Sequence, residues 1–515
     1  MKIYIVWFFI VSTVFIIPIS LSFIFKWKFN EIPEISINAY ILWNFIHFLL
    51  QLIFSFLNYR NMNKIIYKPE NGKKVGLQMV GWKEDPNYFE KALKSIKTIL
   101  GYDKFIFISD GNDEDDYYLQ DIFLKIFPNA YIHNSCNFLY KEEDIWGTIE
   151  SNDVIFCFQK HLGKRHALNS GFSFLKHCNM DYIVTTDSDT IFEKNTIIEL
   201  KKILDHYDNC HGVTGTVKIF NIENFQSLLI SMKYWIAFFI ERGAQSYHGV
   251  VSCIAGPLGM YKTSSISEIQ KEWLEQTFLG QECTFGDDRH LTNLLLSRGY
   301  NIYYNHKAIC WTETPVTLKR WILQQIRWGK SFIRELFLNL KWFHKQSLWL
   351  AYDLLFLSLY SIFLIIGLIV LLFQFKVANL IYFLYSIVIV SSLRGVFGVI
   401  YYKDIRYMYF MFYGLFFVFI LLPIKLWCLF TLKEISWGTS TRKDKKDKTD
   451  LNMLPVILWN ILLFTGIVLT MVFNSEKFND TYIQILTIIL GSLFLIMTIN
   501  YWIFNKWILK LKIEE

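Results

Sequence analysis

Two adjacent carboxylates and an arginine stand in the segment from Gly280 to Asn293, which reads GQECTFGDDRHLTN. A general base that removes a proton from a sugar hydroxyl must stay ionised, and a neighbouring arginine favours the charged form of a carboxyl group. We therefore predict Asp288 as the catalytic base and Asp287 as the second candidate. The alternative is an acidic first turn at the positive end of a helix through Leu291 to Leu296.

A second pair of carboxylates, Asp187 and Asp189, follows the β-branched run from Tyr182 to Thr186. At the end of a strand, two aspartates separated by one residue can both address one hard cation. Mg²⁺ or Mn²⁺ held there would neutralise a nucleotide-sugar diphosphate and stabilise the departing nucleotide. The sequence predicts a metal site at this pair, and the alternative is an ordinary strand end.

Two apolar runs, Val75 to Val80 and Phe105 to Ser109, flank a helical pattern from Tyr88 to Leu100. This order is typical of the first β-α-β unit of an α/β domain. Ligands of such sheets bind beyond the carboxyl ends of the strands, where Asp85 and Asp110 stand. Both aspartates are also ordinary turn residues.

Cations and an amide could contact the same ligand from two further helices. Lys164 and Arg165 follow the strand-like Val154 to Phe158 and open a helix, where they are candidates for a diphosphate contact. In a second helix, Gln324, Arg327 and Trp328 share one face. That face predicts contacts to nucleotide and acceptor, and its alternative is an amphipathic helix at a membrane surface. A turn of small residues between them allows close backbone approach to a ligand, and we assign the acceptor to Cys253, Gly256 and Pro257.

The composition predicts a membrane protein with a globular middle. Of the 515 residues 53% are hydrophobic, and these gather towards the two ends of the chain. Ile3 to Phe25 and Ile37 to Leu57 are long enough to span a bilayer, and the basic residues after the second run place the middle domain in the cytoplasm. The eight cysteines show no C-x-x-C pairing, which argues against a zinc site or a disulfide framework. The net charge of +7 is dispersed, so no nucleic-acid partner is expected.

Five more apolar runs follow the middle domain. Counting every run as a span would leave the lysine-rich Lys433 to Lys448 outside the cell, against the positive-inside rule. We therefore expect Tyr407 to Leu432, which contains Pro423, to be interfacial or re-entrant, leaving six spans. A transporter with a nucleotide-sensing domain is the competing class, for which Arg394 and Lys425 are candidate intramembrane charges.

These motifs resemble the processive family 2 membrane glycosyltransferases, which include cellulose, chitin and hyaluronan synthases. Within that group the chain is most similar to the class I hyaluronan synthases of vertebrates and algal viruses, and chitin synthase is the close alternative. The matching segments are Glu241-Arg242-x-Ala244-Gln245-Ser246, Cys253-Ile254-x-Gly256-Pro257-Leu258-Gly259-Met260-Tyr261, Gly286 to Asn293, Arg327-Trp328-x-Lys330-Ser331 and Trp437-Gly438-Thr439. The chain departs from the pattern at His166 and Asn169-Ser170, and at Gly329, where the family pattern usually has a serine.

The resemblance implies roles for residues of this sequence. Asp85 and Asp110 would hold the uridine, while Lys164 with Asp187 and Asp189 would hold the diphosphate and the metal. Gln324, Arg327 and Trp328 would bind UDP and acceptor, and Asp288 would be the base. Trp437, Gly438 and Thr439 would lie on a gating loop that closes over the nucleotide.

The expected fold is an α/β, GT-A-like domain with a mixed, mostly parallel sheet, inserted between transmembrane helices. The expected function is processive, inverting synthesis and extrusion of a polysaccharide at the plasma membrane. The substrates would be UDP-N-acetylglucosamine (UDP-GlcNAc) and UDP-glucuronate (UDP-GlcA) for hyaluronan, or UDP-GlcNAc alone for chitin. Glucuronate needs a spare cation, for which Lys218, Arg242 and Arg289 are candidates. The expected parts are 1–68 (two spans), 69–318 (catalytic), 319–347 (interfacial), 348–402 (two spans), 403–453 (re-entrant segment and gating loop) and 454–515 (two spans and tail).

Overall fold

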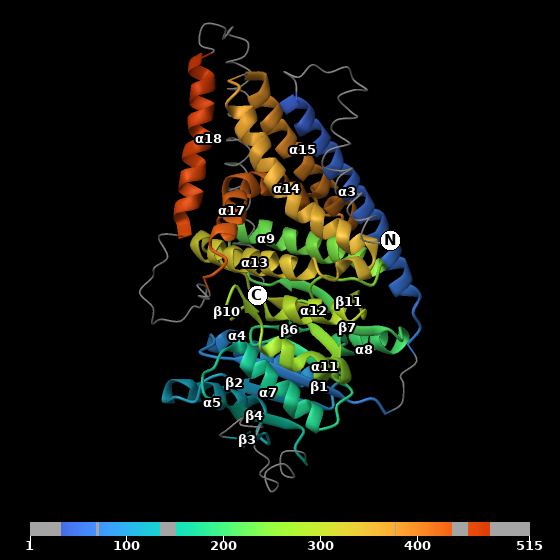
Figure 1. The fold of residues 1–515 in the computed structure, drawn as a ribbon. Coiled ribbons are helices and arrows are strands. Elements are labelled where there is room, and N and C mark those ends of the chain that lie inside the picture. The colour runs from blue at the N-terminus through green and yellow to red at the C-terminus, as the bar shows by residue number, and fades with distance from the viewer. Residues whose placement is uncertain (1–31, 68–71, 134–150, 376, 435–451, 474–515) are drawn as a thin grey trace.

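The computed structural model describes residues 32–67, 72–133, 151–375, 377–434 and 452–473. A domain built on one large sheet lies at one end and a group of upright helices at the other (Figure 1). The predicted spans Ile3 to Phe25 and Tyr482 to Phe504, and the predicted gating residues Trp437, Gly438 and Thr439, lie outside the described residues.

The sheet has nine strands in the order β3-β4-β2-β1-β5-β8-β7-β11-β6. Neighbouring strands run parallel except at β8, which is antiparallel to both neighbours, and at β6. The predicted mixed, mostly parallel sheet is therefore confirmed. The strands are β1 (Val75–Gly81), β2 (Lys104–Ser109), β3 (Tyr131–His133), β4 (Val154–Phe158), β5 (Tyr182–Asp187), β6 (Ile191–Phe192), β7 (Cys210–Ile219), β8 (Gly259–Lys262) and β11 (Asn301–Thr312); β9 (Thr277–Phe278) and β10 (Gln281–Glu282) form a separate hairpin.

Helices cover both faces of the sheet, and strand β2 shows why. Phe107 packs on Phe89 of α4 with ring centroids 4.9 Å apart, whereas Ile108 on the opposite face lies against Gly171 of α7. A strand buried on both faces can be a continuous apolar run, and Phe105 to Ile108 form one between Lys104 and Ser109 of β2. The helices around the sheet are α4 (Pro86–Thr98), η3 (Glu114–Asp116), α5 (Tyr117–Ile126), α7 (Lys164–His177), α8 (Thr196–His206), α11 (Thr263–Leu274) and α12 (Asp287–Ser297).

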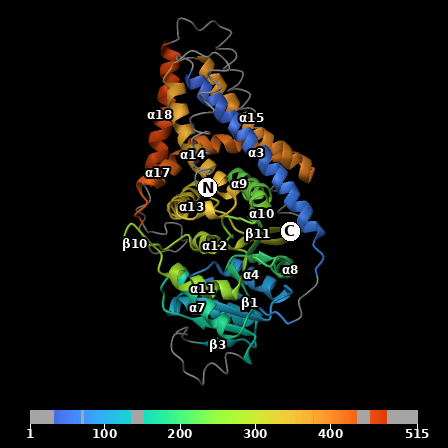
Figure 2. The same cartoon turned by 45° about the vertical axis from the view of Figure 1, so that its right-hand side comes forward.

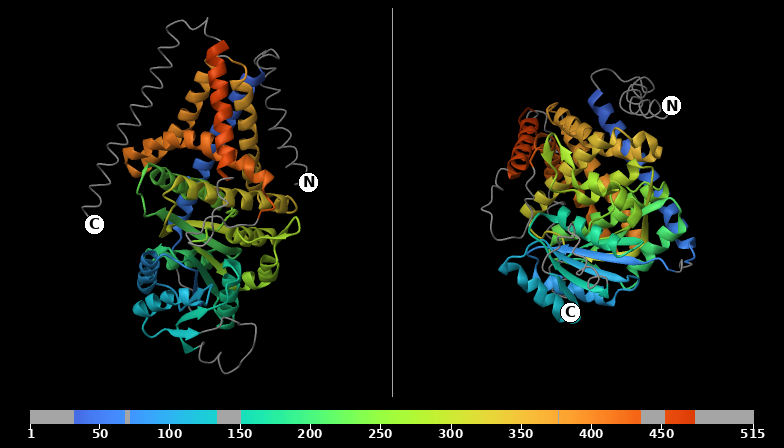
Figure 3. Two further views of the ribbon diagram at one scale, coloured as in Figure 1. Left: turned by 90° about the vertical axis from the view of Figure 1, so that its left-hand side faces the viewer. Right: turned by 60° about the horizontal axis from the view of Figure 1, so that its bottom comes forward.

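A layer of helices separates the sheet from the upright helices (Figure 3). It contains α13 (Leu318–Asn339) and the continuous run α9 (Phe225–Trp235), η4 (Ile236–Arg242) and α10 (Gly243–Tyr247). The segment η4 is a π-helix, a form that often accompanies functional sites because it shifts the register of side chains. The layer therefore faces both the sheet and the membrane helices.

Three described helical segments are long and apolar enough to cross a membrane, namely Leu42–Lys64, Leu348–Leu372 and Ile405–Phe430. The upright helices converge at the end far from the sheet domain and spread apart towards it (Figure 2). The segment from Ile405 to Phe430 instead runs across the foot of these helices in Figures 2 and 3. Its re-entrant character stays a prediction. The elements are α3 (Ile32–Lys64), η5 (Phe343–Lys345), α14 (Leu348–Leu372), α15 (Val377–Tyr402), η6 (Ile405–Phe412), α16 (Tyr413–Phe416), η7 (Phe417–Leu421), α17 (Leu422–Phe430) and α18 (Leu454–Phe473).

Candidate active site

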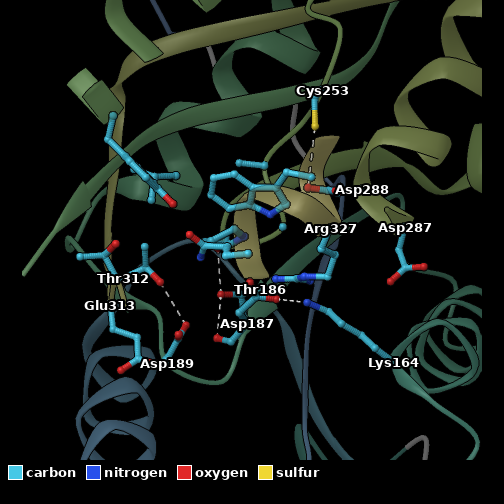
Figure 4. A pocket seen from close by; sticks show the side chains of 18 of the residues that line it. Lys164, Thr186, Asp187, Asp189, Cys253, Asp287, Asp288, Thr312, Glu313 and Arg327 are labelled. Atoms are coloured by element: carbon cyan, nitrogen blue, oxygen red, sulfur yellow. Dashed lines mark hydrogen bonds and ion pairs between the residues drawn. The ribbon is translucent and has the colours of Figure 1, made fainter. Parts of the chain in front are cut away.

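A cavity of about 1380 Å³ opens between the carboxyl ends of the central strands and the helices α12 and α13. Side chains from β5, α7, α12 and α13 point into it (Figure 4). Most residues predicted from the sequence for catalysis or binding line its wall. They are Asp85, Lys164, Asp187, Asp189, Cys253, Gly256, Pro257, Asp287, Asp288, Gln324, Arg327 and Trp328.

Asp288 has one carboxylate oxygen directed to the cavity. Its Oδ1 accepts the backbone N–H of Arg289 at 2.8 Å, and its Oδ2 lies 3.7 Å from Sγ of Cys253. Gly256 lies opposite. A Cβ at Gly256 would stand 3.8 Å from Oδ2 of Asp288 and 3.3 Å from Oδ2 of Asp187. The predicted base and a predicted metal ligand thus face one small space that glycine leaves open.

Asp287 and Arg165 form a buried ion pair. Nε of Arg165 donates to Oδ1 of Asp287 at 2.6 Å, and the two side chains are 5% and 8% exposed. The other guanidinium nitrogens of Arg165 donate to the carbonyl of Trp273 and to the amide of Gln276. Arg165 does not line the cavity. The structure thus places Arg165 away from the cavity wall, and its diphosphate contact stays a prediction. Asp287 is held in an ion pair, whereas none engages Asp288 among the described residues.

The start of helix α12 depends on one glycine. Gly286 has a φ of 89° in the left-handed region, which L side chains rarely adopt. A Cβ there would lie 2.2 Å from Oγ of Ser331 on α13. Only glycine therefore lets α12 begin at Asp287 while packed this closely against α13.

The pair Asp187 and Asp189 lies at the end of β5 as predicted. Nζ of Lys164 donates to Asp187, and Oγ1 of Thr312 donates to Asp189 at 3.2 Å. Burial and the neighbouring carboxylates of Asp187 and Glu313 raise the pKa of Asp189 well above its usual range. Burial alone would lower the pKa of Lys164, but the Asp187 carboxylate outweighs it and the pKa is raised.

Two predicted uridine ligands have other engagements in the structure. Asp110 is 4% exposed, does not line the cavity, and accepts hydrogen bonds from Gln159 Nε2 and from the backbone N–H of Gly163. This carboxylate holds the loop before α7, and its contact with uridine stays a prediction. Asp85 lines the cavity, and its Oδ1 caps helix α4 by accepting the backbone N–H of Asn87 at 2.9 Å.

Helix α13 brings Gln324, Arg327 and Trp328 to the cavity from the membrane side. Oε1 of Gln324 is buried and, within the described residues, has no hydrogen-bond donor. Trp328 is 39% exposed, with its ring centroid 6.4 Å from that of Tyr234. Behind this face Gly329 meets α17, because a Cβ at Gly329 would lie 2.8 Å from Sγ of Cys428. The helix therefore offers the cavity a cation, an amide and an indole.

Comparison with known proteins identifies the family. Residues 142–331 match the family model described as "Glycosyltransferase like family 2". The chain is 35% identical over 478 residues to human hyaluronan synthase 2, covering 89% of this chain and 85% of that one. Hyaluronan synthase 3 of Xenopus laevis is also 35% identical, with coverages of 87% and 82%. The chain belongs to the hyaluronan synthase family.

Membership of the hyaluronan synthase family confirms the predicted glycosyltransferase activity and favours hyaluronan synthase over chitin synthase. A solved mannosyltransferase from Pyrobaculum calidifontis, in complex with GDP-Man and Mn²⁺, is 13% identical to this chain and covers 76% of it with a TM-score of 0.48. The positions at which the chain departs from the family pattern near Lys164 do not line the cavity. Asn169, for example, bonds to Gln270 of α11 through its side-chain amide oxygen.

Glu313 and Tyr234 line the cavity but received no role from the sequence alone. Glu313 stands at the end of β11 beside Asp189, and burial raises its pKa. Tyr234 enters from α9, and Arg242 from the π-helix η4 donates to the carbonyl of Cys253 at 3.0 Å. The only sequence pattern that pointed to Glu313 was its position after a strand, and no local pattern pointed to Tyr234. Of the candidate cations for a glucuronate, Arg242 and Arg289 line the cavity, whereas Lys218 does not and pairs with Glu193.

The Arg165–Asp287 pair should stabilise the fold. Changing Asp287 to Asn leaves a buried guanidinium without its counter-charge, which typically costs about 3–5 kcal/mol. We expect Asp287→Asn to lower the thermal unfolding temperature markedly, whereas Asp288→Asn should melt like the parent protein. Thermal unfolding of the purified full chains measures this, and identical curves for Asp287→Asn and the parent would contradict the structural role of the pair.

Proposed function

We propose that this protein is a processive, inverting synthase that builds hyaluronan from UDP-GlcNAc and UDP-GlcA and extrudes it through its own membrane helices. The observation that carries the proposal is the meeting of Asp288 and Asp187 at Gly256 inside one large cavity. A base for the acceptor and ligands for the donor diphosphate must lie on two sides of the reacting carbon. These two carboxylates are placed for that arrangement.

The reaction is a single displacement. Asp288 accepts the proton of the acceptor hydroxyl, whose oxygen forms a bond to the anomeric carbon of the donor sugar. The bond from that carbon to the β-phosphate oxygen breaks, and UDP departs with the electron pair. Lys164 and Arg327 offer positive charge where the leaving group accumulates negative charge. Attack from the face opposite to UDP inverts the configuration at the anomeric carbon.

A divalent cation fits the residues at the end of β5. Asp187 and Asp189 supply only oxygen ligands, the donor type that Mg²⁺ and Mn²⁺ prefer. Their crowding with Glu313 concentrates negative charge that a cation would neutralise. When bound, the ion supplies charge stabilisation of the departing diphosphate. We assign it to Asp187 and Asp189 and leave the choice between Mg²⁺ and Mn²⁺ to experiment.

Arg289 is our candidate for the glucuronate carboxylate. It lines the cavity next to the base, and its guanidinium lies 5.5 Å from the ring of Phe332. Among the described residues no ion pair engages Arg289, whereas Lys164 pairs with Asp187. A guanidinium without an ion-pair partner can bind the carboxylate of UDP-GlcA, which UDP-GlcNAc lacks.

We also propose a cytoplasmic catalytic domain and a plasma-membrane location with six spans, of which Tyr407 to Leu432 is not one. Lys403 and Lys433 flank that segment. Single cysteines at these two positions should then react with an impermeant maleimide from the same side of the membrane. Labelling from opposite sides would show that the segment crosses.

Replacing the base should stop polymer synthesis while sparing the nucleotide. We expect Asp288→Asn to lower turnover by at least about a hundredfold, the scale of general-base catalysis, with UDP affinity nearly unchanged. Radiolabelled sugar incorporation and calorimetric UDP binding measure the two effects on purified protein. Normal incorporation by Asp288→Asn would remove this residue from the mechanism.

Metal removal should abolish turnover reversibly. We expect excess chelator to stop UDP release and added Mg²⁺ or Mn²⁺ to restore it. Asp189→Ala should weaken binding of Mn²⁺ measured by electron paramagnetic resonance in the presence of UDP. Full turnover in chelator would exclude a divalent cation from the reaction.

The two donors give the sharpest test of the proposed product. UDP-GlcNAc alone should yield no long polymer, and addition of UDP-GlcA should yield a product sensitive to hyaluronidase. Arg289→Gln should weaken UDP-GlcA binding about 10- to 100-fold, from roughly 1.5–3 kcal/mol for a charged hydrogen bond, and leave UDP-GlcNAc binding unchanged.

Arg298 provides the matched control, because its guanidinium pairs with Glu268 and Glu272 on the surface. Arg298→Gln should bind both donors normally. A chitinase-sensitive polymer made from UDP-GlcNAc alone would overturn the assignment of the product. Equal loss of both donors in Arg289→Gln would overturn the role of Arg289 only.

A further inference from the structure

Helix α3 carries a buried polar stripe through a segment that is otherwise apolar enough to cross a membrane. Its members recur every three or four residues, so they share one helical face. Polar side chains in such segments are rare because their desolvation is unfavourable, and their partners therefore indicate what they do. The stripe consists of Asn44, His47, Gln51, Ser55 and Asn58, each at most 4% exposed.

The stripe meets a carboxylate, Asp353 of α14, which is 1% exposed. Nε2 of His47 lies 3.3 Å from Oδ1 of Asp353, and Nε2 of Gln51 donates to the same oxygen at 3.4 Å. The His47 ring stacks on Phe356, with centroids 3.7 Å apart. One oxygen of Asp353 is thus occupied by two residues of the membrane helix α3.

The other oxygen of Asp353 reaches towards the catalytic domain. Nε2 of Gln245 in α10 donates to Oδ2 of Asp353 at 2.6 Å. The amide oxygen of Gln245 accepts the backbone N–H of Ser252 at 3.1 Å and its hydroxyl at 3.3 Å. A backbone N–H can only donate, so the amide oxygen must face Ser252 and the amide nitrogen must face Asp353. The carboxylate therefore fixes the orientation in which Gln245 holds Ser252.

Ser252 begins the loop that faces the reacting groups. The next residue, Cys253, has its Sγ 3.7 Å from the carboxylate of Asp288, and Gly256 leaves open the space between Asp288 and Asp187. Gln245 and Ser252 themselves line the cavity. A continuous set of hydrogen bonds thus joins two membrane helices to the acceptor side of the active site.

We propose that Asp353 is a positioning residue for the acceptor, acting through Gln245 on the loop from Ser252 to Gly256. The inference rests on the proposed function in that it takes this loop as the acceptor side of the reaction. The position of the acceptor against the base therefore depends on where α14 places Asp353 against Gln245 of α10. Asp353 itself does not line the cavity.

A double-mutant cycle tests the proposal, with Asp353→Leu, Gln245→Leu and the double variant in the purified full chain. We expect each single change to lower kcat for UDP release about tenfold, and the double variant to match Gln245→Leu, because coupled residues are not additive. UDP affinity should stay within about twofold of the parent, since the nucleotide side is untouched. Gln51→Leu is the matched control, because Gln51 contacts only the other oxygen of Asp353 among the described residues, and it should keep nearly full kcat.

Effects that multiply to about a hundredfold in the double variant, or an unchanged kcat in either single variant, would overturn the proposal. A parallel loss of UDP affinity would do the same, because it would indicate general disruption. If Asp353→Leu does not fold, Gln245→Leu decides alone. A normal kcat in Gln245→Leu would contradict the proposal, whereas a tenfold loss of kcat at normal UDP affinity would support it. The rate of UDP release can be measured whichever sugar is polymerised. If the product is not hyaluronan, analysis of the polymer would show this independently of the test of Asp353.

Discussion

The buried charge of Arg165 is the constraint on which the active site depends. This guanidinium binds Asp287 at the first turn of α12, and its third nitrogen reaches Gln276, whose own amide nitrogen donates to Glu335 of α13 at 2.6 Å. Burial alone would raise the pKa of Glu335, but hydrogen bonds from His290, Asn293 and Gln276 outweigh it and lower the pKa. Helices α7, α12 and α13 are therefore held together by the buried charges of Arg165 and Glu335, and each charge needs its hydrogen-bond partners.

This network also separates the two adjacent aspartates by role. Both aspartates line the cavity, but Asp287 is bound by Arg165, whereas no ion pair engages Asp288 among the described residues. The proposed reaction at Asp288 would therefore take place on a rigid element, because α12 begins at a glycine packed on α13 and cannot be shifted without breaking the Arg165 pair. Helix α13 in turn lies in the layer between the sheet and the upright helices (Figure 3), so the cavity that it lines adjoins this layer.

Sequence patterns predicted those parts of the site that follow from local rules. A β-branched strand delivers Asp187 and Asp189 at its end, and the acidic start of α12 follows from Gly286 and the leucines after it. Local rules could not decide between Lys164 and Arg165, because successive helical side chains point about 100° apart and only the fold determines which one faces the cavity. Local rules also could not show that Asp110 is buried and bonded to the loop before α7. Asp353 gave no signal at all, because its partners come from α3 and α10, far away in the sequence.

The contact between Gly329 and Cys428 explains one departure from the family pattern, which has a serine after Arg-Trp. Here the missing Cβ is matched by a thiol that approaches from α17, and Sγ of Cys428 also donates to the carbonyl of Ile326 at 3.4 Å. The two positions thus share one volume between α13 and α17. A relative that carries the serine needs a smaller or differently placed side chain at the position of Cys428. Positions 329 and 428 should therefore change together among relatives. Grafting α13 from one synthase onto another would require its α17 as well.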